Sequence, residues 1–478
     1  MEEESVSETP SDIEQAKMPV ARDATTQDTL RSAGSISSQE AVDLSFDETM
    51  DLSGYHGETY TNYKREGGYS LYFRLEILYW LICMLVGIII GLLVFAVDII
   101  SRTFGHFKYA LMSRIVQDCN NDITSCFQVM LFITLGINIV ATMISAIIAA
   151  FEGARTYSGS GLTLTATYLN GIFLPRALCV RTGFAMAIGI MFSLLGGMPT
   201  GREAPMVYLS AILMTSIASG AFFSRLSDKN FLWHFGAVDR DQKDLVSIGA
   251  AAGFAATLGT PFGGVIYVLE EGASFWKQSL AAKATMTAFL AFFVASQLTQ
   301  LTYLAPYNHD IFGSLLEPGL GMDLGIALLD VPVAILMGTL GGALGALFNC
   351  MTMQLRKFRT GYVASIKKKL VESFVIALGV TGIMFANILT SSVCAEDKRV
   401  SRNLFDRRDS FQAVFNHNPV RVLLGPKLPI LGMAAFSSGV LRRPVALTIM
   451  IAELINNFYF VPILLLTTIS AMMIGNLF

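Results

Sequence analysis

Charged residues are scarce in this sequence. Asp, Glu, Lys and Arg make up 15% of its 478 residues, whereas soluble domains carry about 25%. Hydrophobic residues make up 53%, and the mean hydropathy is +0.54. This balance excludes an ordinary soluble domain and indicates a protein that crosses a membrane several times. The net charge of −3 gives no basic excess, so we expect no nucleic-acid partner.

Metal ligands and catalytic groups are also sparse. The six cysteines and five histidines are scattered, without the spacing of a metal site. No nucleophile constellation, phosphate-binding loop or dinucleotide fingerprint is found. We therefore expect no metal, no cofactor and no enzymatic activity. Cys119 and Cys126 share one polar loop, and their spacing allows either a disulfide or two free thiols.

Residues 1–65 lack an apolar period and are rich in Ser, Thr, Asp and Glu. Such a segment cannot bury enough surface to offset its chain entropy, which predicts a disordered acidic tail. It has no basic start followed by an apolar core, so we expect no cleavable signal peptide. Lys64, Arg65 and Arg74 precede the first apolar span and favour a cytoplasmic N-terminus. Residues 66–478 are then a membrane domain.

Apolar segments long enough to cross a bilayer follow the tail. Ala250–Glu271 is a further apolar segment, rich in small residues. A basic cluster between two spans is typical of a cytoplasmic loop, and contact with anionic lipid is the alternative. The cluster consists of Arg356, Lys357, Arg359, Lys367, Lys368 and Lys369. The spans are predicted at Leu75–Ile100, Phe127–Phe151, Ala281–Leu298, Val331–Cys350, Phe374–Leu389 and from Phe460 onward.

The stretch Gly201-Arg202-Glu203-Ala204-Pro205 places two charges between the apolar segments Ala185–Leu195 and Met206–Ile217. An ionisable residue at membrane depth is a functional hypothesis by default. Glycine lets the backbone approach an ion closely, and proline interrupts or starts helices. Broken helices at this depth line cavities, and their N-terminal ends favour anions. The alternative is that Arg202 and Glu203 form an ion pair that only joins two helices.

Two weaker signals flank this stretch. Gly159-Ser160-Gly161 precedes an apolar run, and its hydroxyl and free backbone amides suit an anion, the alternative being an ordinary N-cap serine. Glu270 and Glu271 end another apolar run. Neighbouring helical residues point about 100° apart, so at most one of the two faces a given pathway. The alternative is a solvated helix end.

Three motifs resemble the CLC family of chloride channels and chloride/proton antiporters, both in their residues and in their order along the chain. The C-terminal Gly439–Pro444 and Glu453–Asn457 are similar to that family's penultimate helices. The resemblance covers roughly Tyr69–Phe478. The three motifs are Gly159-Ser160-Gly161, Gly201–Pro205, and the run from Ala251-Ala252-Gly253-Phe254 through Pro261-Phe262-Gly263-Gly264-Val265 to Glu270-Glu271.

The resemblance implies an all-helical, polytopic membrane protein of tilted, broken helices, arranged as two inverted repeats at about 70–300 and 325–478, and a homodimer. It implies that Ser160 binds the central anion, that Glu203 is the gating carboxylate and that Glu271 transfers protons internally. Glu270 would be the structural neighbour of Glu271. The remaining residues expected around the anion are Gly159, Gly161, Gly201, Arg202 and Pro205.

The sequence departs from the family pattern in several places. Leu162-Thr163-Leu164 follows Gly161 where the family has an apolar residue, proline and glutamate, and Ala204 replaces a glycine. The family's Gly-x-Phe-x-Pro loop is not found in its expected place, between Phe411–Arg421 and Leu428–Ser438. We therefore expect an incomplete second repeat. We also expect the family's last helix, its anion-binding tyrosine and its CBS domains to be lacking.

The resulting prediction is transmembrane chloride transport by voltage-dependent chloride/proton antiport, because Glu271 resembles a residue of the antiporters. The alternatives are a CLC-type voltage-gated chloride channel and a non-transporting, shortened isoform that modulates a full-length subunit. The expected partners are chloride, protons, membrane lipid, and a second copy or a full-length paralogue. The sequence assigns no particular membrane.

Overall fold

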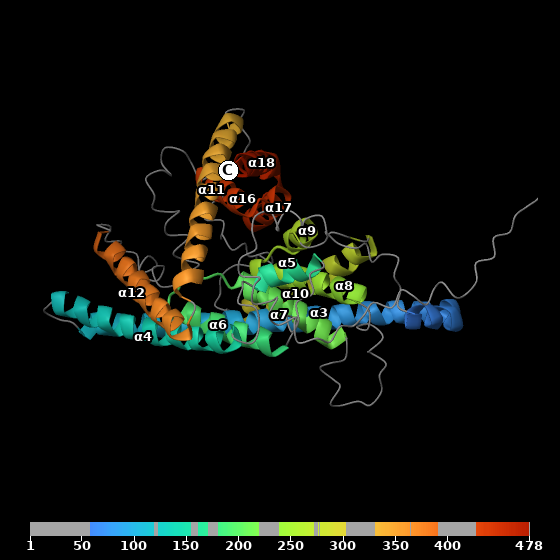
Figure 1. Cartoon of the computed structure of the whole chain (residues 1–478), viewed down its shortest axis with the longest axis horizontal. Coiled ribbons are helices and arrows are strands. Elements are labelled where there is room, and N and C mark those ends of the chain that lie inside the picture. Colours follow the sequence, from blue (N-terminus) through green and yellow to red (C-terminus); the bar gives the residue numbers. More distant parts are fainter. Residues whose placement is uncertain are drawn as a thin grey trace, which may run out of the picture. The chain divides into compact units, whose positions relative to one another are not determined.

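The fold is that of a computed structural model, drawn in Figure 1. It describes residues 58–118, 123–153, 161–170, 180–218, 239–271, 276, 278–302, 330–363, 365–390 and 427–477. Residues 51–478 form one compact unit, which contains all of these ranges. Every regular element in them is a helix, and six of the helices are long and apolar enough to cross a membrane. The predicted all-helical membrane class is confirmed.

The helices follow one another along the chain with few long gaps. The first half contains α3 Glu58–Asp118, α4 Ile123–Gly153, α5 Gly161–Leu169, α6 Val180–Leu195, α7 Glu203–Ala218, α8 Asp239–Leu258, α9 Pro261–Glu271 and α10 Gln278–Thr302. The second half contains α11 Asp330–Tyr362, α12 Ile366–Thr390, α16 Lys427–Leu441, α17 Pro444–Ile455, a 3₁₀ turn at Phe458–Phe460 and α18 Val461–Asn476.

Three boundaries differ from the predictions. α3 begins at Glu58, inside the predicted tail, because a helix does not have to stop where its apolar residues do. Residues 1–57 lie outside the described residues, and their disorder stays a prediction. The apolar run Ala250–Glu271 is two helices, since Gly259 takes a φ of +77° and Pro261 begins α9. α11 continues through basic residues to Tyr362.

Two hydrophobic clusters form the core. The first is formed mainly by α3, α7, α8, α9 and α10, and the second by α11, α16 and α18. α7 is deeply buried, because no residue from Met206 to Ile217 is accessible to solvent beyond a few per cent. α17 belongs to both clusters: Ala446 and Met450 pack into the first, and Ile451 and Ala452 into the second. α17 therefore connects the two halves of the unit.

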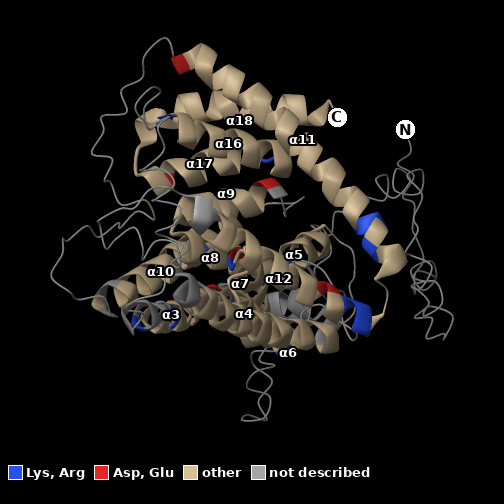
Figure 2. Ribbon diagram, turned by 90° about the vertical axis from the view of Figure 1, so that its left-hand side faces the viewer, with Lys and Arg blue, Asp and Glu red and all other residues tan. Residues whose placement is uncertain are grey.

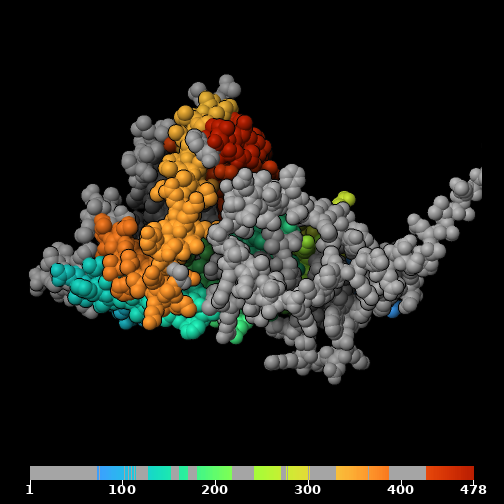
Figure 3. Space-filling model, viewed as in Figure 1, coloured from blue at the N-terminus to red at the C-terminus, as the bar shows by residue number. Residues whose placement is uncertain are grey.

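α11 packs against α16 and α18 through glycine. A Cβ atom at Gly345 would lie 2.5 Å from the carbonyl carbon of Gly439, so the two backbones touch directly. The other face of α11 is open, as its place at the surface in Figure 3 shows. That face carries leucines that suit lipid tails: Leu336, Leu340, Leu344 and Leu347, each 55–60% exposed. The buried face carries Gly338, Gly341, Gly342 and Gly345.

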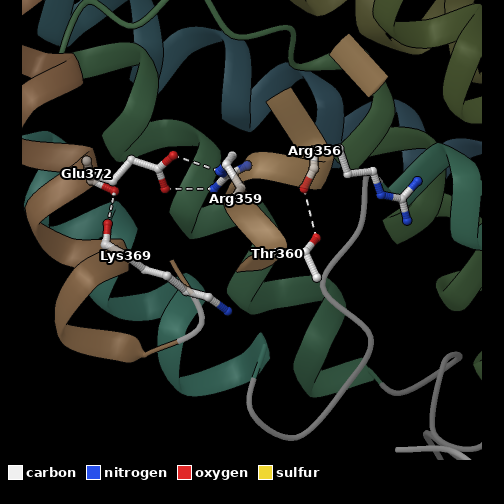
Figure 4. Close-up of polar contacts among 6 residues, drawn as sticks. Arg356, Arg359, Thr360, Lys369 and Glu372 are labelled. Atoms are coloured by element: carbon white, nitrogen blue, oxygen red, sulfur yellow. Dashed lines mark hydrogen bonds and ion pairs between the residues drawn. The ribbon is translucent and has the colours of Figure 1, made fainter. Parts of the chain in front are cut away.

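The predicted basic cluster lies where α11 ends and α12 begins, and all six of its residues are exposed. Figure 2 shows these ends as neighbouring blue segments. Arg359 forms a bidentate ion pair with Glu372, with Nε 2.7 Å from Oε1 and Nη2 3.0 Å from Oε2. In Figure 4 the side chains of Arg356 and Lys369 extend away from that pair. The assignment of the whole basic cluster to a cytoplasmic loop, or to contact with anionic lipid, stays a prediction.

The glycine packing of α11 gives a matched pair of substitutions. Gly345→Ala should lower the stability of the protein by about 1–3 kcal/mol, because the new methyl group overlaps the backbone of α16. Gly361→Ala is the control, since no atom lies within 4 Å of its Cβ position. It should be neutral or stabilising, because alanine is the better helix former. Thermal unfolding in detergent measures both, and equal shifts would refute the packing argument.

Candidate functional site

The predicted gate residue Glu203 is the first residue of α7, and it is half-buried. The segment before it, Gly196–Arg202, turns sharply, with Gly197 at a φ of +69°. Because the rest of α7 is buried, its start points backbone N–H groups into the protein. The N–H groups of Glu203 and Ala204 donate to none of the described residues. Such donors at a half-buried helix start suit an anion.

The Glu203 carboxylate is not anchored. None of the described residues donates a hydrogen bond to it. It lies back over Gly201, where a Cβ atom would displace it. A carboxylate beside free backbone donors, without a fixed partner of its own, is free to occupy the helix start or to leave it.

Arg202 forms an ion pair with Asp98 of α3, not with Glu203. This contact corrects the alternative in which Arg202 and Glu203 pair and join two helices. Neighbouring residues at a helix start point in different directions, and Asp98, buried within the first span, takes the guanidinium. The pair neutralises Arg202 and leaves Glu203 without a cationic partner among the described residues.

The structure brings the start of α5 against the start of α7. A Cβ atom at Gly161 would lie 3.0 Å from the carbonyl oxygen of Ala204 and 2.6 Å from the Cβ of Tyr208. Two of the predicted motifs, far apart in sequence, therefore meet beside Glu203. Gly159 and Ser160 lie outside the described residues, so the anion-binding role of Ser160 stays a prediction. Pro205 lies in the first turn of α7.

α9 and α17 cap each other. The Glu453 carboxylate of α17 accepts hydrogen bonds from Phe262 N at 3.0 Å and Gly263 N at 2.8 Å, at the start of α9. The Glu270 carboxylate of α9 accepts from Val445 N at 3.4 Å and Ala446 N at 2.7 Å, at the start of α17. Each carboxylate thereby satisfies two N–H groups that have no partner within their own helix.

Hydrogen bonds to the start of α17 therefore hold the Glu270 side chain in place, and the alternative of a solvated helix end does not apply to it. Arg443 adds to this contact, since its Nη1 donates to the carbonyl oxygen of Glu270 at 2.6 Å. Glu271 is the last residue of α9, and the structure does not describe its side chain. Its proton-transfer role therefore stays a prediction.

Sequence reasoning missed Asp98 and the capping roles of Glu270 and Glu453. The signals were present: Asp98 is an acidic residue in an apolar span, and in both capping helices a proline is followed nine residues later by glutamate, Pro261 to Glu270 and Pro444 to Glu453. The pattern Gly-x-Phe-x-Pro does occur in this chain, as Gly171–Pro175 in the first half. It lies outside the described residues and not in the place where the family carries its anion loop.

These features define a class of protein: a polytopic membrane protein in which a half-buried helix start offers backbone donors beside a carboxylate that no described residue anchors. A family profile described as voltage gated chloride channel matches residues 140–425. Since the match spans more than half of the 478 residues, the chain belongs to the voltage-gated chloride channel family, CLC.

Individual relatives agree with this membership. The chain is 28% identical over 354 residues to H(+)/Cl(-) exchange transporter 7 of Homo sapiens, which covers 73% of this chain and 43% of that relative. The structure is similar to a eukaryotic CLC transporter, with a TM-score of 0.59, 20% identity, and coverage of 84% and 72% of the two chains. It is also similar to a slow cyanobacterial Cl-/H+ antiporter, with a TM-score of 0.59, 16% identity, and coverage of 84% and 94%.

These likenesses confirm the CLC-type fold that the motifs predicted. The match covers only part of the relative, because the chain spans 43% of the length of the human transporter that it matches. The activity of such a whole transporter does not transfer to this chain by similarity alone.

The Arg202–Asp98 pair predicts a large effect of one substitution. Asp98→Asn should destabilise the protein by about 3–5 kcal/mol, because it leaves the guanidinium of Arg202 without its buried counter-ion. Glu372→Gln is the control: it breaks the exposed pair with Arg359 and should cost less than about 1 kcal/mol. Thermal unfolding of purified protein in detergent compares them. Similar costs for both variants would contradict a structural role for the buried pair.

Proposed function

We propose that this chain is part of a voltage-dependent chloride/proton antiporter of the CLC type. The observation that carries the proposal is the start of α7, where the N–H groups of Glu203 and Ala204 and the adjoining Glu203 carboxylate have no hydrogen-bond partner among the described residues. An anion and a carboxylate compete for such a position, since both are negative and both accept from backbone amides. Protonation of Glu203 removes one competitor and so couples the two ions.

The other parts of the antiport mechanism rest on the resemblance. Ser160 would add a hydroxyl donor to the anion, next to the start of α5 at Gly161. Glu271 would carry protons between Glu203 and the opposite side, and it favours an antiporter over a channel. Membership of the family also supports a homodimer with a cytoplasmic N-terminus, in a membrane that we do not assign.

A second function, modulation of a full-length subunit, has its own supporting observation. The family's Gly-x-Phe-x-Pro loop is not found in its place in the second half. Each hydrogen-bond donor that an anion loses costs on the order of 1–3 kcal/mol. A chain with fewer donors would bind chloride weakly by itself and would act by associating with a complete subunit.

Glu203→Gln tests the antiport proposal. In liposomes that contain the purified chain, the variant should continue to move chloride, while its proton flux falls by at least about 100-fold, because the amide cannot carry a proton. A chloride electrode and a pH electrode record both fluxes in the same vesicles.

Glu372→Gln serves as the control and should keep both fluxes, because this partly exposed carboxylate pairs with Arg359 and lies far from Glu203 in the sequence. Proton-coupled exchange that survives Glu203→Gln would overturn the proposed role of this residue. If the chain alone moves no chloride but alters the flux of a co-expressed full-length relative, the modulator function replaces antiport.

A further inference from the structure

Lys108 of α3 is a buried cation that has no counter-ion among the described residues. Its side chain is 7% exposed, and its ammonium makes one hydrogen bond, to Asn138 Oδ1 at 2.5 Å. The other buried lysine of the described residues, Lys283, has a carboxylate partner, Glu76 Oε1, at 2.8 Å. A buried and unpaired charge is costly. The described part of the chain supplies no negative group to offset that of Lys108.

The single acceptor of Lys108 is fixed in orientation. Asn138 of α4 donates from Nδ2 to Thr381 Oγ1 at 2.9 Å, and Thr381 in turn donates to the carbonyl oxygen of Ala377 at 2.8 Å. The amide oxygen of Asn138 therefore faces Lys108. An ammonium has three N–H donors, and this network accepts one of them.

Two glycines lie beside the ammonium and the Thr142 hydroxyl. The Cβ position of Gly197 lies 3.6 Å from Lys108 Nζ, so the ammonium lies just beneath an exposed glycine of the segment that leads to Glu203. The neighbouring Gly196 lies against the hydroxyl of Thr142, which is buried and has no hydrogen-bond partner. Burial lowers the pKa of Lys108 to about 8, so the ammonium is still mostly charged at neutral pH.

We propose that Lys108 binds a small inorganic anion, chloride in the first instance, beside Gly196 and Gly197, with the Thr142 hydroxyl as a second donor. The anion supplies the missing counter-charge and accepts from the N–H groups that Asn138 leaves free. This position is separate from the start of α7, and it does not require that the chain transports ions. It would hold an anion at the approach to Glu203.

The test is chloride-dependent thermal stability of the purified full chain in detergent. Chloride replaces gluconate at constant ionic strength. In Lys108→Met the chloride concentration for half of the stabilising effect should rise at least about tenfold, since a hydrogen bond to a charged group is lost. Lys283→Met is the matched control, because that buried lysine has a protein carboxylate, and it should keep the wild-type chloride response.

A second variant covers the case in which Lys108→Met does not fold. Gly197→Asp tethers a carboxylate next to the ammonium, and aspartate tolerates the positive φ at this position. It should be at least as stable as the wild type without chloride and should respond as weakly to added chloride as Lys108→Met. A wild-type chloride response in both variants overturns the proposal. Phosphate that stabilises the wild type at lower concentration than chloride overturns the halide assignment and points to a phosphate group.

Discussion

The structure depends on a reciprocal exchange of helix caps between its two halves. The carboxylate of Glu453 closes the start of α9, and that of Glu270 closes the start of α17. Both helices begin with proline, which has no N–H, so the next two backbone donors are the ones that need a partner. α17 also contributes side chains to both hydrophobic clusters. The two carboxylates thus supply acceptors at two partly exposed helix starts, and each joins a helix of one half to a helix of the other.

The caps explain why Glu203 differs from the other two carboxylates. At α9 and α17 a carboxylate from the opposite half occupies the helix start. At α7 no described residue does so, and the local carboxylate is itself unanchored. Arg202, which would otherwise hold a negative group there, is neutralised by Asp98. Among the described residues, two helix starts are therefore closed by a carboxylate from the other half, while the third has no such cap. That difference is the physical basis of the proposed exchange between chloride and the Glu203 carboxylate.

Much of this arrangement could be predicted from the sequence. The low charge and long apolar runs indicated the membrane fold, and the order of the glycine and proline motifs indicated the family, because both depend on local residue chemistry. The partner of Arg202 could not be predicted in the same way. Asp98 lies 104 positions before Arg202, and only the tertiary fold brings them together. The capping pairs span 175 to 191 positions for the same reason, although the shared spacing from proline to glutamate was visible in both helices.

The division of the carboxylates into two fixed caps and one free group is tested most directly by three alanine substitutions. Thermal unfolding of Glu270→Ala, Glu453→Ala and Glu203→Ala would be compared in the same detergent. Glu270→Ala and Glu453→Ala should each destabilise the protein by about 0.5–2 kcal/mol, because two N–H groups at a partly exposed helix start lose the carboxylate that caps them. Glu203→Ala should leave stability nearly unchanged, since no described residue donates to that carboxylate. A loss for Glu203→Ala as large as for the two caps would contradict the account.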